Sequence, residues 1–272
     1  MKLIELVGST GSGKTTIARA IDSYFNLSKT HKLSWHRKSI ANFFIYEEPL
    51  NYIHKLVKFS PNLISFRDRL AYWIYQNDKI SLKYKNIFLE KNIRLYFQVL
   101  KNINDSQHTE SHKVNIRKWF LSTGGIYQFF QTHYHSSEHS LFDEGFLGIA
   151  VNQFSGINHP AKDKSLENYL KLIPEIDLVI NLKITKDECY KRLKRRNTLP
   201  MRLSGFTDKE ILNYIHSSNK VINASLSYLK NYNANLKIIE IDNSKEIDSV
   251  INNLILGIKT YINSKGTVVN ID

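Results

Sequence analysis

An apolar segment at the start of the chain runs directly into a glycine-rich loop. Lys2–Val7 is mostly apolar and ends at a glycine, which predicts a buried strand, and Thr15–Phe25 has apolar residues at helical spacing. Between the two, Gly8–Thr15 matches G-x-x-x-x-G-K-[ST] at every fixed position. A strand, this loop and a helix in that order are the context in which the motif binds the phosphates of a nucleotide. The alternative is an ordinary Gly/Ser turn between a strand and a helix.

The loop predicts a role for its residues. Its glycines allow backbone N–H groups to turn inward around phosphate oxygens, and the start of the following helix adds partial positive charge. Lys14 is expected to reach the β- and γ-phosphates, and the hydroxyl of Thr15 is expected to ligate Mg²⁺. The residues expected to bind the nucleotide are Gly8, Ser9, Thr10, Gly11, Ser12, Gly13, Lys14, Thr15 and Thr16.

Beyond the loop the sequence has no repeats and no Pro/Gly linker. The stretches "SLFDEG", Ile176–Ile184 and Leu236–Asp242 predict strands, the last two as core strands, and either "HKLSW" or "NFFIYEEP" hides a short strand. The part from residue 26 to 139 is mostly helical and aromatic. We therefore expect one α/β domain over residues 1–272 with a helical insertion at about residues 40–138.

Some helix boundaries are also predicted. Thr185 and Thr207 are each followed three residues later by a glutamate, which is the spacing of a capping box at a helix start. The stretch "NIRKWFLSTGGIYQFFQTHY" has helical apolar spacing up to a break at Gly124-Gly125. The polar stretch Asn104–Lys113 predicts an exposed loop, and the tail after the last helix is expected to be loose or to add to a sheet edge.

Two carboxylates follow the apolar "LF" of "SLFDEG". Asp143 is expected to hold the water shell of Mg²⁺ from the side opposite Thr15, although D-E-G is also a common turn composition. For Glu144 three alternatives stay open: it activates a water molecule, it contacts an acceptor, or it has no role. The first alternative would favour an ATPase.

The most basic part of the chain is the segment from Lys183 to Arg202, with eight Lys and Arg residues against two carboxylates. Arginines close to a transferring phosphoryl group stabilise the charge on its equatorial oxygens. Arg192 and Arg196 lie four apart, which predicts one helix face, and Pro200 is expected to end that helix and begin a loop. The segment at about residues 190–206 is therefore a candidate lid, against the alternative of a solvated basic helix end.

In this order the parts of the chain resemble the thymidylate kinase, deoxynucleoside kinase and nucleoside monophosphate kinase group of P-loop kinases. The resemblance spans roughly residues 2–25 and 140–256 and is specific at the loop and at the lid, where "DLVINLKIT" leads to "ECYKRLKRR". It implies a P-loop three-layer α/β fold with a mainly parallel sheet of about five strands flanked by helices. It also implies ATP with Mg²⁺ and a small acceptor bound by the helical insertion.

The same resemblance implies roles for single residues. Gly8 to Thr16 would hold ATP, and Asp143 would be a metal or catalytic carboxylate. Arg192 and Arg196 match the pair that such kinases carry at the lid, with Arg195 and Arg202 as neighbours.

The chain departs from this pattern in two places. Such kinases often have Asp-Arg or Glu-Arg-Ser where this chain has Asp143-Glu144-Gly145, so an arginine that grips phosphate is missing there. Many also carry Glu-Pro at the end of the second strand. "YEEP" could be that feature, with Glu48 or Glu47 as the base for a substrate hydroxyl, and the alternative is a helix start around Pro49.

Three arginines of the insertion lie among aromatic residues: Arg67 and Arg69 in "SFRDRLAYW", and Arg117 in "NIRKWF". An arginine beside aromatic rings can grip an anionic group and help to stack a base or sugar. The alternative is that the rings belong to the core and the arginines to the surface.

The composition of the chain indicates which partners and which compartment suit the protein. The net charge of +13 suits polyanionic partners, and nucleic acid is one candidate. It is not the favoured one, because the sequence has neither a basic tail nor a known nucleic-acid-binding motif. The lone Cys189 suits a reducing compartment. No stretch approaches the ~20 apolar residues of a membrane span, and the apolar start is too short for a signal peptide. We expect a cytoplasmic protein whose oligomeric state stays open, with a homodimer among the options.

Three functions fit the sequence, in decreasing order of support. The first is an ATP-dependent kinase acting on a nucleoside, nucleotide or sugar-like hydroxyl, with catalysis by Lys14, Asp143, Glu144, Arg192 and Arg196. The second is an ATPase or nucleotide switch that acts on a macromolecule. The third is a polynucleotide end-processing kinase.

Overall fold

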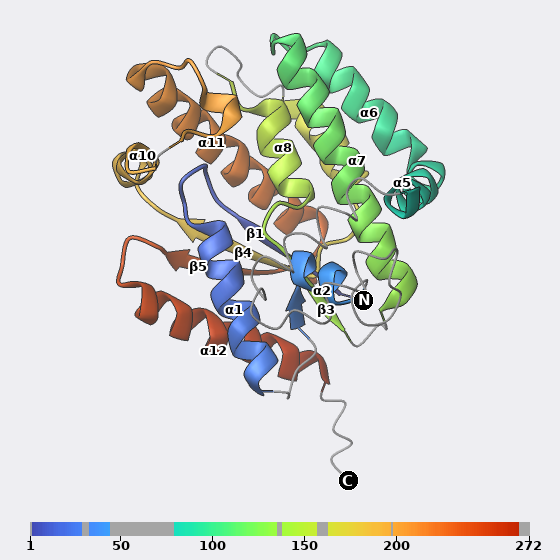
Figure 1. Cartoon of the computed structure of the whole chain (residues 1–272), viewed down its shortest axis with the longest axis vertical. Coiled ribbons are helices and arrows are strands. Elements are labelled where there is room, and N and C mark those ends of the chain that lie inside the picture. Colours follow the sequence, from blue (N-terminus) through green and yellow to red (C-terminus); the bar gives the residue numbers. More distant parts are fainter. Residues whose placement is uncertain are drawn as a thin grey trace, which may run out of the picture.

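The strands form one parallel sheet. The computed structural model of the 272-residue chain describes residues 2–28, 33–43, 79–134, 138–156, 163–196 and 198–266. Within these ranges the strands pair in the order β2-β3-β1-β4-β5 (Figure 1). Their bounds are β1 Lys2–Val7, β2 Leu33–Trp35, β3 His139–Phe142, β4 Leu178–Lys183 and β5 Lys237–Asp242. Four strands of four to six residues make up most of the sheet, and the three-residue β2 lies at its edge.

The central strand β1 has a buried side chain on each face of the sheet. Its Leu3 and Val7 join one apolar cluster, and Ile4 and Leu6 join another, as the two-residue period of a strand requires. A parallel strand that is apolar on both faces needs helices on both faces. The predicted α/β class, a mainly parallel sheet flanked by helices, is confirmed.

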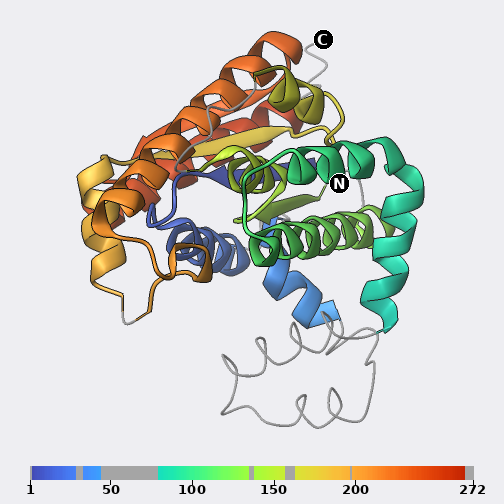
Figure 2. The ribbon, with the colours of Figure 1, turned by 90° about the horizontal axis from the view of Figure 1, so that it is seen from above.

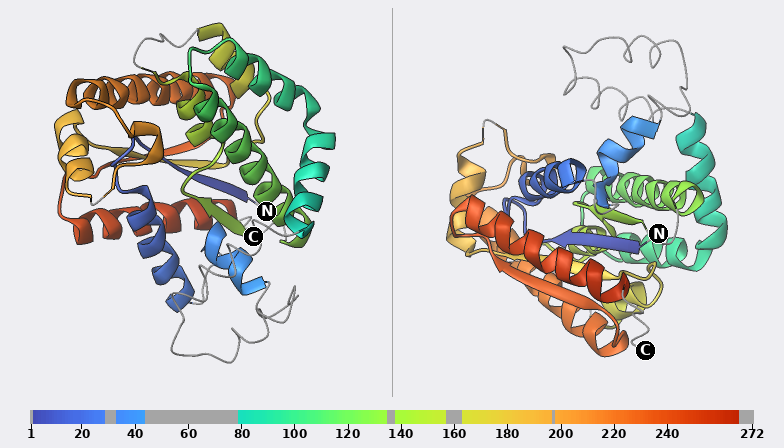
Figure 3. Two further views of the ribbon diagram at one scale, coloured as in Figure 1. Left: turned by 45° about the horizontal axis from the view of Figure 1, so that its top comes forward. Right: turned by 90° about the horizontal axis from the view of Figure 1, so that it is seen from below.

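Helices cover the two faces of the sheet (Figures 2 and 3). α1 (Lys14–Ser28) and α12 (Ile247–Gly266) pack on the face toward which Ile4 points. α7 (Glu110–His133), α8 (Phe146–Phe154) and α11 (Asp208–Tyr232) supply the apolar cluster on the opposite face. The other described helices are α2 His36–Asn42, α5 Lys79–Lys91, α6 Ile93–Asn104, α9 Asp163–Leu170, α10 Lys186–Lys194 and the short 3-10 helix η3 Met201–Leu203.

Helix α7 runs without interruption through Gly124-Gly125, so the predicted break there is wrong. A Cβ atom at Gly124 would lie 2.2 Å from the Phe88 ring, and one at Gly125 would lie 2.8 Å from the Lys85 side chain. Both neighbours belong to α5. The two glycines therefore allow α5 to approach α7 closely, which a sequence pattern cannot distinguish from a helix break.

Helix α10 ends at Lys194, well before Pro200. Arg195 is its C-cap, and Arg196 lies in the segment after the helix. The predictions that Arg192 and Arg196 share a helix face and that Pro200 ends the helix are therefore wrong. The predicted helix starts are correct, because Thr185 accepts a hydrogen bond from the backbone of Glu188 and Thr207 forms a reciprocal capping box.

Other sequence expectations need smaller corrections. β5 is an edge strand whose residues are exposed or half-buried, rather than a core strand. The loop expected over Asn104–Lys113 is shorter, since α6 extends to Asn104 and α7 begins at Glu110. The short strand lies in "HKLSW". Among the helices that the structure describes, none has the length and apolar character to cross a bilayer.

Candidate nucleotide and acceptor site

The glycine-rich loop leaves the carboxyl end of β1, between β3 and β4. The chain turns toward β2 after β1 and toward β4 after β3, so β1 lies where the direction of the connections reverses, the usual place for a ligand in an open α/β sheet. Gly11 and Gly13 have φ of +92° and +88°, which glycine adopts without strain. The loop conformation therefore explains these two glycines.

The ammonium group of Lys14 lies over the loop. Its Nζ donates hydrogen bonds to the carbonyl oxygens of Gly8, at 2.7 Å, and Ser9, at 3.2 Å. Burial and the positive charge of Arg202 lower the pKa of Lys14 to about 8. The ammonium is thus held by neutral carbonyls in a partly dry site, where a phosphate oxygen would be a stronger partner.

Asp143 joins the loop to the strand β3. Its Oδ2 accepts a hydrogen bond from Thr15 Oγ1 at 2.9 Å, and its Oδ1 accepts one from the indole Nε1 of Trp35 at 3.0 Å. The side chain is fully buried, which by itself raises the pKa, but His36, Arg37 and the two hydrogen bonds outweigh burial and lower it. Asp143 is therefore a carboxylate at neutral pH.

Thr15 and Asp143 fit a Mg²⁺ site in their chemistry. Mg²⁺ prefers oxygen ligands and is usually held by one or two protein oxygens together with phosphate oxygens and water. The described residues contain no cluster of three or more His, Cys, Asp or Glu side chains that could hold a metal alone. A metal at this site would therefore depend on the phosphates of a bound nucleotide.

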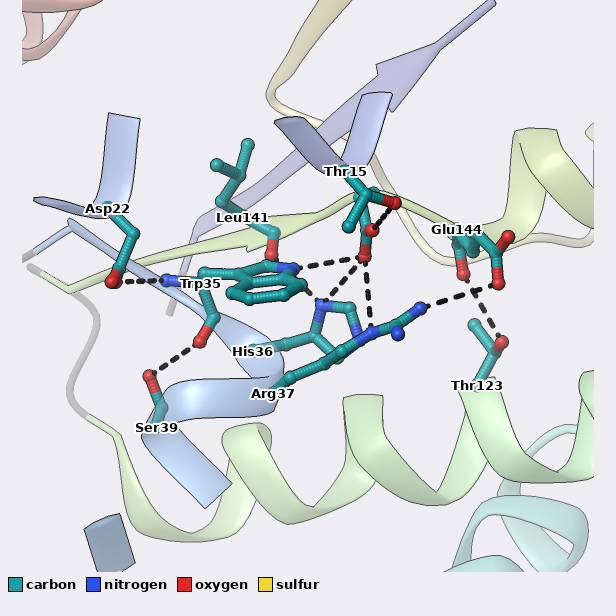
Figure 4. Close-up of polar contacts among 10 residues, drawn as sticks. Thr15, Asp22, Trp35, His36, Arg37, Ser39, Thr123, Leu141 and Glu144 are labelled. Carbon is teal, nitrogen blue, oxygen red and sulfur yellow. Dashed lines mark hydrogen bonds and ion pairs between the residues drawn. The ribbon is translucent and has the colours of Figure 1, made fainter. Parts of the chain in front are cut away.

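The turn from β2 into α2 adds side chains to the site that the sequence did not point to (Figure 4). Arg37 Nε lies 3.6 Å from Asp143 Oδ1, and an Arg37 terminal nitrogen lies 3.5 Å from Glu144 Oε2. His36 Nδ1 lies 3.1 Å from the carbonyl oxygen of Leu141, so this nitrogen carries the proton and donates. Burial lowers the pKa of His36 to about 4, which makes the imidazole neutral at pH 7.

Glu144 projects toward solvent beside the buried Asp143. Its side chain is 60% exposed, against 0% for Asp143. The hydroxyl of Thr123 on α7 donates to the backbone carbonyl of Glu144 at 3.5 Å. The two adjacent carboxylates thus have different surroundings. Asp143 is buried and bonded to the loop, whereas Glu144 is open to solvent.

The arginines of the candidate lid are in different places. Arg192 donates to Glu188 and to the backbone carbonyl of Asn243, and its guanidinium would lie 3.7 Å from a Cβ atom at Gly13. Arg196 lines a cavity outside the loop. Arg195 is exposed to solvent and lines no part of this cavity.

Arg202, on η3, makes the most contacts of the lid arginines with the site. It donates to Thr10 Oγ1 at 2.8 Å and to Asn152 Oδ1 on α8 at 2.7 Å. Its guanidinium lies 5.8 Å from the ring centre of Trp119 on α7. One side chain therefore links the lid, the phosphate loop and two helices.

Two cavities meet over the loop. An outer cavity of about 390 Å³ lies between the loop and the lid residues Arg196, Thr198, Leu199 and Pro200. An inner cavity of about 220 Å³ lies between the carboxyl end of β1, α7 and α8. The residues that line both are Thr10, Lys14, Trp119, Glu144 and Arg202.

The other loop residues and the arginines of the insertion lie in several different places. Ser9 and Ser12 are buried under the loop, with Ser9 Oγ 3.0 Å from Cys189 Sγ, and Thr16 is an exposed residue that lines the outer cavity. Arg117 lines neither cavity. Glu47, Glu48, Pro49, Arg67 and Arg69 lie outside the described residues.

Glu5 is a buried carboxylate on the apolar strand β1, and the sequence pattern does not predict a role for it. Its two oxygens accept hydrogen bonds from the backbone N–H groups of Phe146, at 2.8 Å, and Leu147, at 2.9 Å. A Cβ atom at Gly145 would lie 2.2 Å from the Glu5 carboxyl carbon. Glu5 therefore fixes the start of α8, a helix that lines the inner cavity, and requires glycine after Glu144.

Comparisons with known proteins give little beyond this geometry. No protein-family model matches the chain, and no curated protein matches it. Among solved structures, deoxyadenosine kinase from M. mycoides with bound dATP is 12% identical with a TM-score of 0.44, covering 95% of this chain and 100% of that chain. The same kinase with dCMP and a flexible dCDP is 14% identical with a TM-score of 0.43, covering 95% and 99%. With bound dCTP it is 12% identical with a TM-score of 0.39, again covering 95% and 99%.

With TM-scores below 0.5, these likenesses carry no argument about this chain.

Proposed function

We propose that the protein is an ATP-dependent phosphotransferase that moves the γ-phosphoryl group of ATP to a hydroxyl of a small acceptor. The observation that carries the proposal is the pair of cavities that share Lys14, Glu144 and Arg202 as a common wall. The outer cavity, bounded by the loop and the lid, suits a triphosphate. The inner cavity is lined in large part by residues of α7 and α8 and suits a second, small molecule.

The shared wall is where the transfer would take place. Phosphoryl transfer needs two molecules held in line and positive charge around the moving group. Lys14 and Arg202 supply that charge at the junction of the cavities. Mg²⁺ held near Thr15 and Asp143 would supply further neutralisation of the phosphate oxygens.

In the proposed reaction, the acceptor oxygen forms a bond to the γ-phosphorus, and the bond to the β,γ-bridging oxygen breaks to release ADP. The proton of the acceptor hydroxyl needs a base within reach. Glu144 is a carboxylate that lines both cavities, while Asp143 is already bonded to Thr15 and Trp35. We assign the proton to Glu144.

The proposal is tested by screening nucleosides, nucleotides and sugars for ADP release that depends on the acceptor. Lys14→Ala is expected to lower the acceptor-dependent rate about 100-fold or more, the usual effect of removing one group that stabilises the transition-state charge. Lys191→Ala is the matched control, since Lys191 is exposed and lines neither cavity. Acceptor-dependent release that survives Lys14→Ala would refute the proposal.

Hydrolysis is the second candidate function, and the exposure of Glu144 favours it. A carboxylate that is 60% exposed at the junction could activate water as well as an acceptor hydroxyl. Steady ADP release without any acceptor, abolished by Glu144→Gln, would identify an ATPase. A kinase would instead show slow release that rises when its acceptor is added.

A further inference from the structure

We propose that Arg37 is a built-in counterion of Asp143, that Mg²⁺ bound with a nucleotide displaces it from Asp143, and that Glu144 alone then holds it. This rests on the proposed function only in taking Asp143 as a carboxylate that helps to hold the Mg²⁺ of the bound nucleotide.

The position of the guanidinium between two carboxylates is the first support. Arg37 lies 3.6 Å from Asp143 on one side and 3.5 Å from Glu144 on the other. Asp143 is fully buried and Glu144 is open to solvent. A small rotation of one side chain is therefore enough to move the positive charge from the metal side to the acceptor side.

The second support is the identity of the cation beside Asp143. His36 also lies near this carboxylate, at 3.8 Å, but its Nδ1 is 3.1 Å from the carbonyl oxygen of Leu141 and is bonded there, whereas an arginine guanidinium is always charged. Arg37 therefore supplies the positive charge at this distance. A divalent cation brought to the same carboxylate would repel the guanidinium strongly at so short a separation.

The anchoring of the β2–α2 turn is the third support. The backbone N–H of Trp35 donates to Asp22 on α1 at 3.0 Å, and Lys38 Nζ donates to the other oxygen of Asp22 at 3.0 Å (Figure 4 shows the first of these). The ring of His36 stacks on Phe142 of β3 at 4.7 Å. The backbone around Arg37 is thus fixed on both sides, so the exchange involves its side chain alone.

Arg37 also lines the inner cavity and not the outer one. When Glu144 holds it, the guanidinium fixes the orientation of this carboxylate toward the acceptor. No arginine directly follows Asp143 in the sequence. The β2–α2 turn instead brings the guanidinium of Arg37 to this place.

The test measures how strongly Mg²⁺ improves nucleotide binding, with no acceptor present. Binding of the non-hydrolysable ATP analogue AMPPNP is measured by isothermal titration calorimetry at pH 7.5. The readout, called the metal-linked factor, is the Kd of this analogue in EDTA divided by its Kd in saturating Mg²⁺. Arg37→Gln removes the competing cation, so this factor is expected to rise about three- to tenfold. Arg37→Lys keeps a cation there and is expected to stay near the wild-type factor.

Arg19→Gln is the matched control. Arg19 lies 5.7 Å from the ring centre of Trp35, and Arg37 lies 5.5 Å from the same centre, but Arg19 is exposed and lines neither cavity. Its loss removes the same charge and the same type of ring contact. A factor that does not rise in Arg37→Gln, or that rises equally in Arg19→Gln, overturns the proposal.

Glu144→Gln tests the same claim without changing Arg37. It removes the group that receives the guanidinium, so the metal-linked factor is expected to fall, and to fall much less in the Arg37→Gln background. An unchanged factor, or an equal fall in both backgrounds, overturns the proposal, because it would mean that Glu144 acts on the metal directly or not at all. A protein that binds the analogue with Mg²⁺ as expected but phosphorylates no acceptor would refute the kinase function and leave the role of Arg37 supported.

Discussion

Replacing Glu5 by Gln is expected to change how the stability of the protein depends on pH. Glu5 is fully buried on β1 and caps the start of α8 with two backbone hydrogen bonds. Burial raises the pKa of Glu5 from 4.5 to about 7, although the two hydrogen bonds act in the opposite direction. Glutamine has nearly the same shape but cannot ionise. Its amide nitrogen cannot accept one of the two backbone hydrogen bonds, which lowers the stability by an amount that does not depend on pH, so the effect of the charge is read from the pH dependence alone.

The sign follows from proton linkage. Between pH 4.5 and pH 7 the folded protein holds the Glu5 proton more tightly than the unfolded chain does, so the free energy of unfolding falls as the pH rises through this range. A pKa difference of this size corresponds to about 3 kcal/mol. The wild type is therefore expected to lose about 3 kcal/mol relative to Glu5→Gln between pH 4 and pH 8.

The assay is urea unfolding of both proteins at intervals from pH 4 to pH 8, with the difference in unfolding free energy plotted against pH. Glu240→Gln on the edge strand β5 is the control. A hydrogen bond from Lys183 lowers the pKa of Glu240, so its contribution is present at neutral pH and is lost as the pH falls, a slope of opposite sign. A Glu5→Gln difference that stays constant over this pH range would refute the reasoning.

Two further substitutions test the packing and the site. Gly124→Ala would bring a Cβ atom to 2.2 Å from the Phe88 ring and is expected to destabilise the protein by about 1–3 kcal/mol, measured as a lower Tm. Gly148→Ala on α8 is its control, because nothing lies within 4 Å of a Cβ atom there, and an equal loss in both would contradict the packing argument. Trp35→Phe removes the indole donor to Asp143 and is expected to lower the free energy of unfolding by about 1–3 kcal/mol at pH 7 by urea titration. Wild-type stability would mean that this hydrogen bond contributes little.

Local patterns in the sequence predict the structure around the glycine-rich loop well. The strand, loop and helix around Gly8–Thr15 are contiguous, and their apolar periodicity and glycines report on structure within a few residues. Asp143 could also be predicted, because it directly follows an apolar strand that pairs with β1. Thr15 donates a hydrogen bond directly to Asp143, the two residues that the sequence assigned to opposite sides of a Mg²⁺ site.

The residues around the inner cavity could not be predicted, because they come together only in the tertiary structure. Arg37 meets Glu144 across more than 100 positions of sequence, and no motif marks the β2–α2 turn. Glu5 is hidden because one carboxylate in an apolar strand gives no signal about the helix start that it caps. The sequence predicts the end of α10 at Pro200, whereas the helix ends six residues earlier, at Lys194, without a proline.

Under the proposed function, helix α7 divides the possible routes by which the acceptor preference could change. One side of it is held by the contact of Gly124 and Gly125 with α5, where even a methyl group has no room. Its cavity side carries a different set of residues at helical spacing: Trp119, Ser122, Thr123 and Ile126. A lineage could therefore exchange these four side chains one at a time without moving the helix. New substrates would be reached by changing the wall of the cavity rather than its frame.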